Sequence, residues 1–152
     1  MKILPLRAHH LMCLTIPGPE FYIPLSKELF VSKGYPEAWV EYWLGLYQTV
    51  RSNPDRKIRV VVGEPDDACL YPCLRWVDGK CISTIDWASW DERAAERLKL
   101  AHGDEITVKT LIARIAKEVS PEKPFELCVE VCPTECWDKC AEVLRRGDLL
   151  FI

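Results

Sequence analysis

The 152-residue sequence has no long hydrophobic run, no block of like charge and no glycine-rich phosphate-binding motif. Spanning a bilayer takes about 20 consecutive apolar residues, so we expect no membrane partner. The net charge is -3 with both signs interspersed, which gives no field to attract nucleic acid. At the N-terminus, Pro5, Arg7 and the adjacent pair His9 and His10 interrupt any apolar signal-peptide region. These absences predict a cytoplasmic protein.

The chain is long enough to bury a core without covalent staples. Its hydrophobic fraction of 49% is that of a globular protein, and no linker or repeat divides it. We therefore expect a single cysteine-rich domain over residues 1–152. Stability alone does not explain why it carries eight cysteines.

The cysteines fall into two groups. The first is four cysteines at every fourth position in the C-terminal stretch CVEVCPTECWDKC. The second is a C-x3-C-x7-C array of three near the middle, together with one cysteine shortly after the histidine pair. Clustered thiols occur in zinc sites, iron-sulfur clusters and disulfide frameworks, and a reducing compartment disfavours the last. The candidate metal or cluster ligands are Cys13, Cys69, Cys73, Cys81, Cys128, Cys132, Cys136 and Cys140.

The C-terminal group cannot serve one site as a straight helix. In that case Cys128 and Cys140 would lie about 18 Å apart along the axis, whereas sulfurs on one zinc ion lie within about 4 Å of one another. Pro133 predicts a bend, because it cannot donate a helical hydrogen bond. The group then forms either one bent site at a helix N-terminus, or two parts, one of which joins Cys13 or a histidine.

The histidine pair lies three and four residues before Cys13, so in a helical turn either imidazole shares a face with the thiol. His9 and His10 are therefore possible ligands, or residues that hydrogen-bond to a ligand, and packing or capping is the alternative. Asp66 and Asp67 precede Cys69. For these two carboxylates, turn and cap roles are commoner than acid-base chemistry, and we predict the former.

Regular patterns predict the scaffold. Apolar residues at helical spacing indicate helices over residues 36–50, within 83–100 and over 108–119. The second is most regular over 91–100 and is stopped by Gly103, and the third is capped by Thr107. Residues 57–62, KIRVVV, indicate a strand, and the Asp78-Gly79 turn lets the chain double back toward Cys81. The predicted fold is α+β: a mainly helical single domain with a small β-sheet around 57–63, and loops and helix ends gathered around the cysteines.

Four pieces of sequence resemble domain-of-unknown-function family 1284, small bacterial and archaeal proteins. They are LRAHHLMCL, GYPEAWVEYW, PDDAC followed by PC and a later cysteine, and the closing cysteine-rich segment, in that order. The resemblance implies an iron-sulfur role for Cys13, Cys69, Cys73, Cys81 and the closing cysteines. It does not imply a reaction.

These observations leave several functions open. The leading hypothesis is an iron-sulfur protein with one or two clusters, of the 4Fe-4S type, used in electron transfer or redox sensing with an unknown redox or protein partner. The alternative is a zinc-stapled interaction module. A thiol enzyme using Cys13 with His9 or His10 is disfavoured because no orienting residue accompanies the pair. Disulfides remain open for an exported protein.

Overall fold

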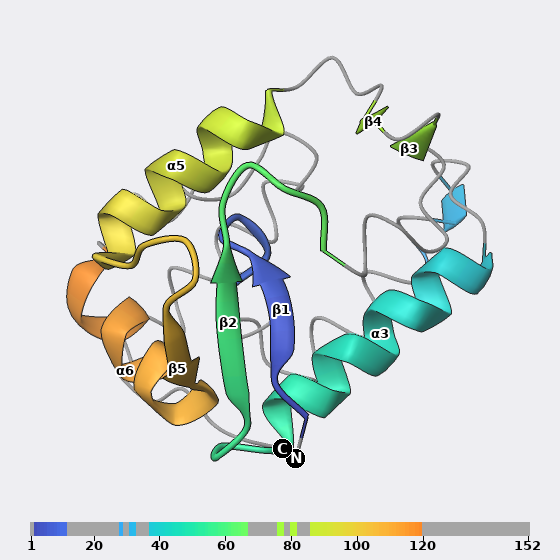
Figure 1. Ribbon diagram of the computed structural model, residues 1–152. Helices are drawn as coiled ribbons and strands as arrows, with labels where there is room; N and C mark the ends of the chain where they lie inside the picture. The colour runs from blue at the N-terminus through green and yellow to red at the C-terminus, as the bar shows by residue number, and fades with distance from the viewer. Residues whose placement is uncertain are drawn as a thin grey trace.

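The computed structural model describes residues 2–11, 28, 31–32, 37–66, 76–77, 80–81 and 86–119. Helical residues outnumber strand residues among them, and three strands form a small mixed sheet. The predicted α+β class is confirmed. Figure 1 shows the helices arranged around this sheet.

The sheet has the strand order β1-β2-β5. Strand β1 (Leu4–Arg7) runs parallel to β2 (Lys57–Val61), and β5 (Glu105–Thr107) is antiparallel to β2. Parallel neighbours need a crossover connection, and this one includes helix α3 (Glu37–Arg51). The parallel pairing extends one residue beyond the strand, because Ala8 N donates to Val61 O at 2.9 Å. The carboxyl ends of β1 and β2 therefore meet at one edge of the sheet.

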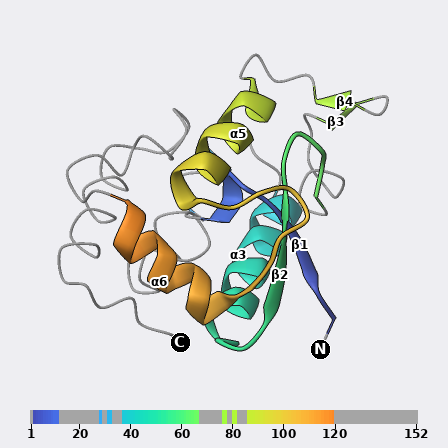
Figure 2. The ribbon, with the colours of Figure 1, turned by 60° about the vertical axis from the view of Figure 1, so that its left-hand side comes forward.

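One hydrophobic core joins the sheet to three helices. Helix α3 buries Val40, Trp43, Tyr47 and Val50 at three- and four-residue intervals, as its sequence pattern predicts. Two further helices in the described part of the chain, α5 (Trp87–Leu98) and α6 (Val108–Glu118), belong to the same core. Figure 2 shows α5 and α6 in front of the sheet and α3 behind it. Burying each large apolar side chain contributes about 1.5–3 kcal/mol, so this core fixes the strand ends in place.

The helix ends confirm one prediction and correct another. Thr107 caps α6 as predicted, its Oγ1 accepting from Thr110 N at 3.3 Å. Gly103 is not the stop of α5: the helix ends at Leu98, and Lys99 adopts the left-handed conformation at φ 56°. The Lys99 N–H donates to Ala95 O and Glu96 O, so backbone hydrogen bonds end the helix without a glycine.

A two-stranded hairpin carries one of the cysteines. Strands β3 (Trp76–Val77) and β4 (Lys80–Cys81) pair antiparallel, with Trp76 opposite Cys81. The chain therefore doubles back before Cys81, as the sequence predicts.

Candidate functional site

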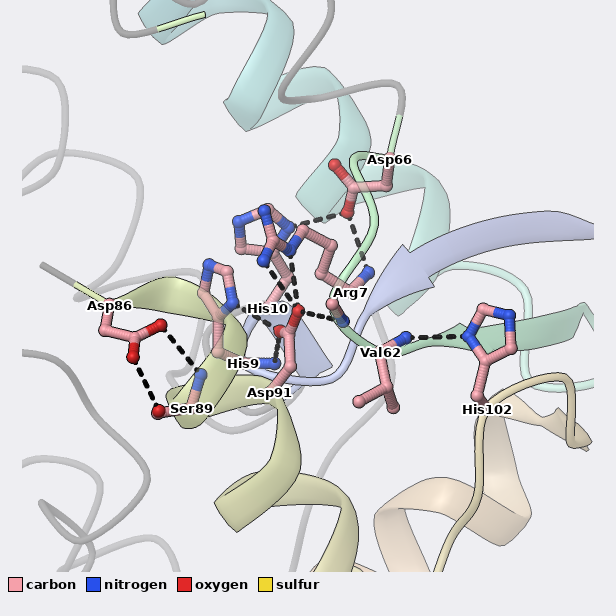
Figure 3. Close-up of polar contacts among 10 residues, drawn as sticks. Arg7, His9, His10, Val62, Asp66, Asp86, Ser89, Asp91 and His102 are labelled. Atoms are coloured by element: carbon pink, nitrogen blue, oxygen red, sulfur yellow. Dashed lines mark hydrogen bonds and ion pairs between the residues drawn. The ribbon is translucent and has the colours of Figure 1, made fainter. Parts of the chain in front are cut away.

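Polar residues gather where the parallel strands β1 and β2 end. Arg7 is the last residue of β1, and His9 and His10 follow it after one residue, Ala8. Gly63 and Asp66 follow β2. The carboxyl ends of parallel strands are the usual edge for binding sites in sheets that contain them. Figure 3 shows this cluster, into which α5 projects Asp91.

Helix α5 is positioned by its own cap. Asp86 accepts from Ser89 N at 3.2 Å and from Ser89 Oγ at 2.7 Å. Asp91, five residues after Asp86, lies on the buried face of the helix with Ala94, Ala95 and Leu98. A carboxylate is thus carried on an apolar stripe into the interior, where it is 0% exposed.

Asp91 joins three segments of chain. Its Oδ2 accepts from Arg7 Nε at 2.8 Å and from Gly63 N at 3.0 Å, and it forms an ion pair with Arg7 Nη2 at 2.7 Å. Gly63 has φ +75°, a backbone conformation that side chains disfavour. Because Arg7 and Asp91 are both buried, each charge needs the other, and loss of either would leave an unpaired charge in the core.

His9 completes the Asp91 site. Oδ1 of Asp91 accepts from His9 N at 3.2 Å and contacts His9 Nδ1 at 2.6 Å. Burial, with a smaller effect of His10, lowers the pKa of His9 to about 4 despite the opposing contact with Asp91. Hydrogen bonds from His9 and Arg7, with their charges, lower the pKa of the Asp91 carboxyl against the opposing effect of burial. At neutral pH the contact is therefore a hydrogen bond from the Nδ1–H of a neutral ring to a carboxylate, rather than an ion pair.

His10 has a carboxylate of its own. Its Nδ1 lies 2.7 Å from Asp66 Oδ2, which also accepts from Arg7 N at 2.8 Å. The His10 ring is edge-on to His9, with centroids 4.1 Å apart, and edge-on to Trp43 at 5.0 Å. Backbone, carboxylate and two aromatic neighbours therefore hold this imidazole in one orientation.

Both histidines thus present the same chemistry. A carboxylate at Nδ1 fixes the ring and its tautomer and leaves Nε2 as the basic nitrogen, the arrangement found behind histidine ligands of metals. The same arrangement orients a histidine beside a nucleophile. The sequence-based expectation that no orienting residue accompanies the pair is wrong, since Asp91 and Asp66 do so.

The structure adds a contact that the predicted turn or cap role of Asp66 did not include. This residue is 2% exposed and binds a histidine across the strand ends. The sequence reasoning missed Arg7 and Asp91 altogether. A signal for Asp91 was present: its spacing to Ala94, Ala95 and Leu98 places a charge on the buried stripe of its helix.

Most predicted cysteine ligands lie outside the described residues. Cys81 is described through its backbone in β4. The bend at Pro133 also lies outside the described residues, as do the ligand candidates Cys13, Cys69, Cys73, Cys128, Cys132, Cys136 and Cys140. Within the described part of the chain, no three His, Cys, Asp or Glu side chains form a group that could hold a metal ion. All eight cysteines therefore remain predictions.

Comparison with known proteins identifies a family. No described helix has the length and apolar character to cross a membrane. No curated protein and no solved structure gives a significant match to the chain. The family model described as "Protein of unknown function (DUF1284)" matches residues 34–141, which cover Asp66, Asp91 and most of the cysteines. The chain therefore belongs to the DUF1284 family.

Proposed function

We propose that this protein binds iron-sulfur clusters, one or two per chain, and uses them in electron transfer or redox sensing. The observation that carries the proposal is the hydrogen bond between His10 Nδ1 and Asp66 Oδ2 at 2.7 Å. It joins the two chain segments that lead directly to Cys13 and to Cys69.

The short chain segments between this hydrogen bond and the two cysteines limit where the thiols lie. Cys13 follows His10 by three residues, and Cys69 follows Asp66 by three. Three residues span at most about 11 Å even when fully extended. Each thiol is therefore within about 11 Å of one end of the same partly buried hydrogen bond, which supports assigning Cys13 and Cys69 to the same site.

The remaining thiols of the first group are compatible with that site. Cys73 lies four residues beyond Cys69, and the β3–β4 hairpin turns the chain back before Cys81. Thiolates suit iron-sulfur clusters and zinc alike. The carboxylate-held imidazoles add nitrogen donors of the type that both metals accept. Cys128, Cys132, Cys136 and Cys140 would supply the second group.

Anaerobic purification tests the proposal. Brown protein with broad visible absorption, iron and acid-labile sulfide is the expected result. Colourless protein with stoichiometric zinc would overturn the iron-sulfur assignment in favour of a zinc-stapled interaction module.

The enzymatic alternative is supported by one observation of its own. Asp66 and Asp91 supply the orienting carboxylates that cysteine-histidine catalysis uses, and Cys13 is the nearby thiol in sequence. An alkylating agent would distinguish this function. Modification of Cys13 much faster than of the other cysteines, unchanged by a chelator, would favour it, whereas equal rates once metal is removed would exclude it.

A further inference from the structure

We propose that His102 is a proton-operated latch on the loop after β2. Its neutral ring holds the backbone amide of Val62, and its protonated ring releases that amide and turns to the carboxylate of Glu64. The loop comprises residues 62–66 and ends in Asp66, so the latch makes a segment of the candidate site respond to pH. This inference does not depend on the proposed function.

The turn that carries His102 is fixed to strand β2. Gly103 N donates to Val60 O and Val60 N donates to Asp104 O, each at 2.8 Å. Within the turn, Ala101 N donates to the Asp104 carboxylate at 2.8 Å, and Asp104 N donates to Ala101 O at 3.0 Å. The backbone of His102 is therefore held beside the end of β2, so its imidazole can change partners while the turn stays in place.

The ring accepts a hydrogen bond from the first backbone amide beyond the strand. Val62 N donates to His102 Nδ1 at 3.0 Å (Figure 3). A backbone N–H can only donate, so Nδ1 carries no proton and the proton of the neutral ring is on Nε2. That nitrogen lies 3.9 Å from Glu64 Oε2. The ring thus lies between an amide that uses its lone pair and a carboxylate that favours its positive charge.

Protonation of the ring removes the acceptor. In an imidazolium ion both nitrogens carry hydrogen, so Nδ1 and the Val62 amide become two donors that face each other. The charge of histidine ordinarily changes between about pH 5 and 8. The side chains of His102 and Glu64 are 50% and 69% exposed, so protons reach the ring directly from solvent. The hydrogen bond to Val62 is therefore lost when the ring becomes charged.

Glu64 is the carboxylate that the described residues offer to the charged ring. Lys99, which follows α5, instead contacts Glu118 at 3.3 Å, and Asp104 of the same turn accepts from Ala101 N. Within the described part of the chain, no carboxylate of β5 or α5 forms an ion pair with the ring. Protonation therefore exchanges the contact with the amide for a contact with Glu64, and the effect is local.

The other anchors of the loop lie in the buried cluster. Gly63 N donates to Asp91 Oδ2 at 3.0 Å, and Asp66 Oδ2 accepts from Arg7 N at 2.8 Å. The side chains of both aspartates are 0% exposed. Because these contacts do not involve the latch, they hold the rest of the loop when the first amide is released. The Gly63 amide is therefore an internal reference for its neighbour.

Hydrogen exchange of the full chain tests the latch. Rates of single amides, measured from about pH 8 to about pH 5 and corrected for the intrinsic pH dependence of exchange, give protection factors. The protection of Val62 should fall by about 5- to 10-fold in one step, as for one lost hydrogen bond, while that of Gly63 stays constant. His102→Asn is the matched variant, because its side-chain oxygen accepts a hydrogen bond without titrating. The step should vanish in this variant.

A second measurement needs no variant. Nuclear magnetic resonance of the chain labelled with ¹⁵N-histidine should show the His102 proton on Nε2 at the upper end of the pH range. This tautomer should disappear together with the protection of Val62 as pH falls. A proton on Nδ1, constant protection of Val62, or the same step in His102→Asn would overturn the proposal. An equal step at Gly63 would also overturn it, because the loop would then open as a whole.

Discussion

His9 and His10 are adjacent in sequence, and each directs Nδ1 to a buried aspartate at 2.6 or 2.7 Å. Their surroundings differ. Asp91 at His9 also binds a buried arginine and the backbone amide of Gly63, whereas Asp66 at His10 also binds the backbone amide of Arg7. The comparison teaches that one kind of pair serves two purposes. The His9 pair belongs to a buried charge cluster with Arg7, and the His10 pair joins the loop after β2 to the segment that follows β1.

The most disruptive change is expected at the His9 pair. Asp91→Asn removes the charge that balances Arg7 in the core, so the free energy of unfolding should fall by about 3–5 kcal/mol. Urea denaturation measures this. The control is Glu92→Gln, an exposed residue on the same helix, which should change stability by less than about 0.5 kcal/mol. Similar losses in both variants would contradict the structural role of Asp91.

Acid should weaken the same pair. His9 has a pKa of about 4 in the folded protein against 6.5 for an unperturbed ring, so the unfolded chain binds more protons between those values. Its contribution is complete above about pH 6.5 and is lost as pH falls toward 4, by about 3 kcal/mol in total. His9→Gln should flatten this part of the pH profile of stability and His102→Gln should not. A profile that His9→Gln leaves unchanged would disprove the assignment.

At the His10 pair, metal affinity should change more than stability. Asp66→Asn removes the carboxylate that joins the chain segments leading to Cys13 and Cys69, so the proposed iron site should bind iron less tightly. The stability cost of the lost or weakened hydrogen bonds of Asp66 should be about 1–3 kcal/mol. Iron retention under chelator challenge, compared with that of Asp91→Asn at matched folded fraction, separates the two pairs. Equal iron loss in Asp66→Asn and Asp91→Asn would contradict a separate role for the His10 pair.

A backbone change tests the loop that binds Asp91. Gly63 has φ +75°, and a Cβ there would meet nothing within 4 Å. Gly63→Ala should therefore cost about 1–2 kcal/mol through backbone strain alone. Thermal unfolding checks the value, and no loss of stability would mean that the loop relaxes to another conformation.

The smallest effect is expected away from both pairs. Lys99 ends α5 at φ 56°, so Lys99→Gly should raise the free energy of unfolding by about 1 kcal/mol. Its exposed contact with Glu118 at 3.3 Å contributes little. Urea denaturation should detect the gain, while iron content stays unchanged. A loss of iron would show that the C-terminus of α5 bears on the metal site.

The scaffold was predictable because it depends on local patterns. Strand β2, helix α3 and the cap at Thr107 follow from period and capping chemistry that a few residues carry. Strands β1 and β5 were not predicted, since three or four residues give too short a pattern and their pairing with β2 is long-range.

The candidate site also has a part that local sequence predicts and a part that depends on long-range contacts. The histidine pair was recognisable from its spacing to Cys13, but its two aspartates lie 56 and 82 residues away in sequence. Nothing local links Asp91 to His9; only the parallel pairing of β1 with β2 and the packing of α5 bring them together. The one local indication of this site was Asp91, a charged residue on the apolar stripe of α5. A charge on the buried face of a predicted helix is therefore a useful sign of a polar site.

Iron content of two single variants and their double variant tests the central claim that one site joins Cys13 to Cys69. We predict that Cys13→Ser and Cys69→Ser each lose the same cluster, so Cys13→Ser/Cys69→Ser loses no more iron than either alone, while the iron held by the second cysteine group is unchanged. Additive losses, with the double variant losing the sum of the two, would show that the two thiols serve different sites and would contradict the account.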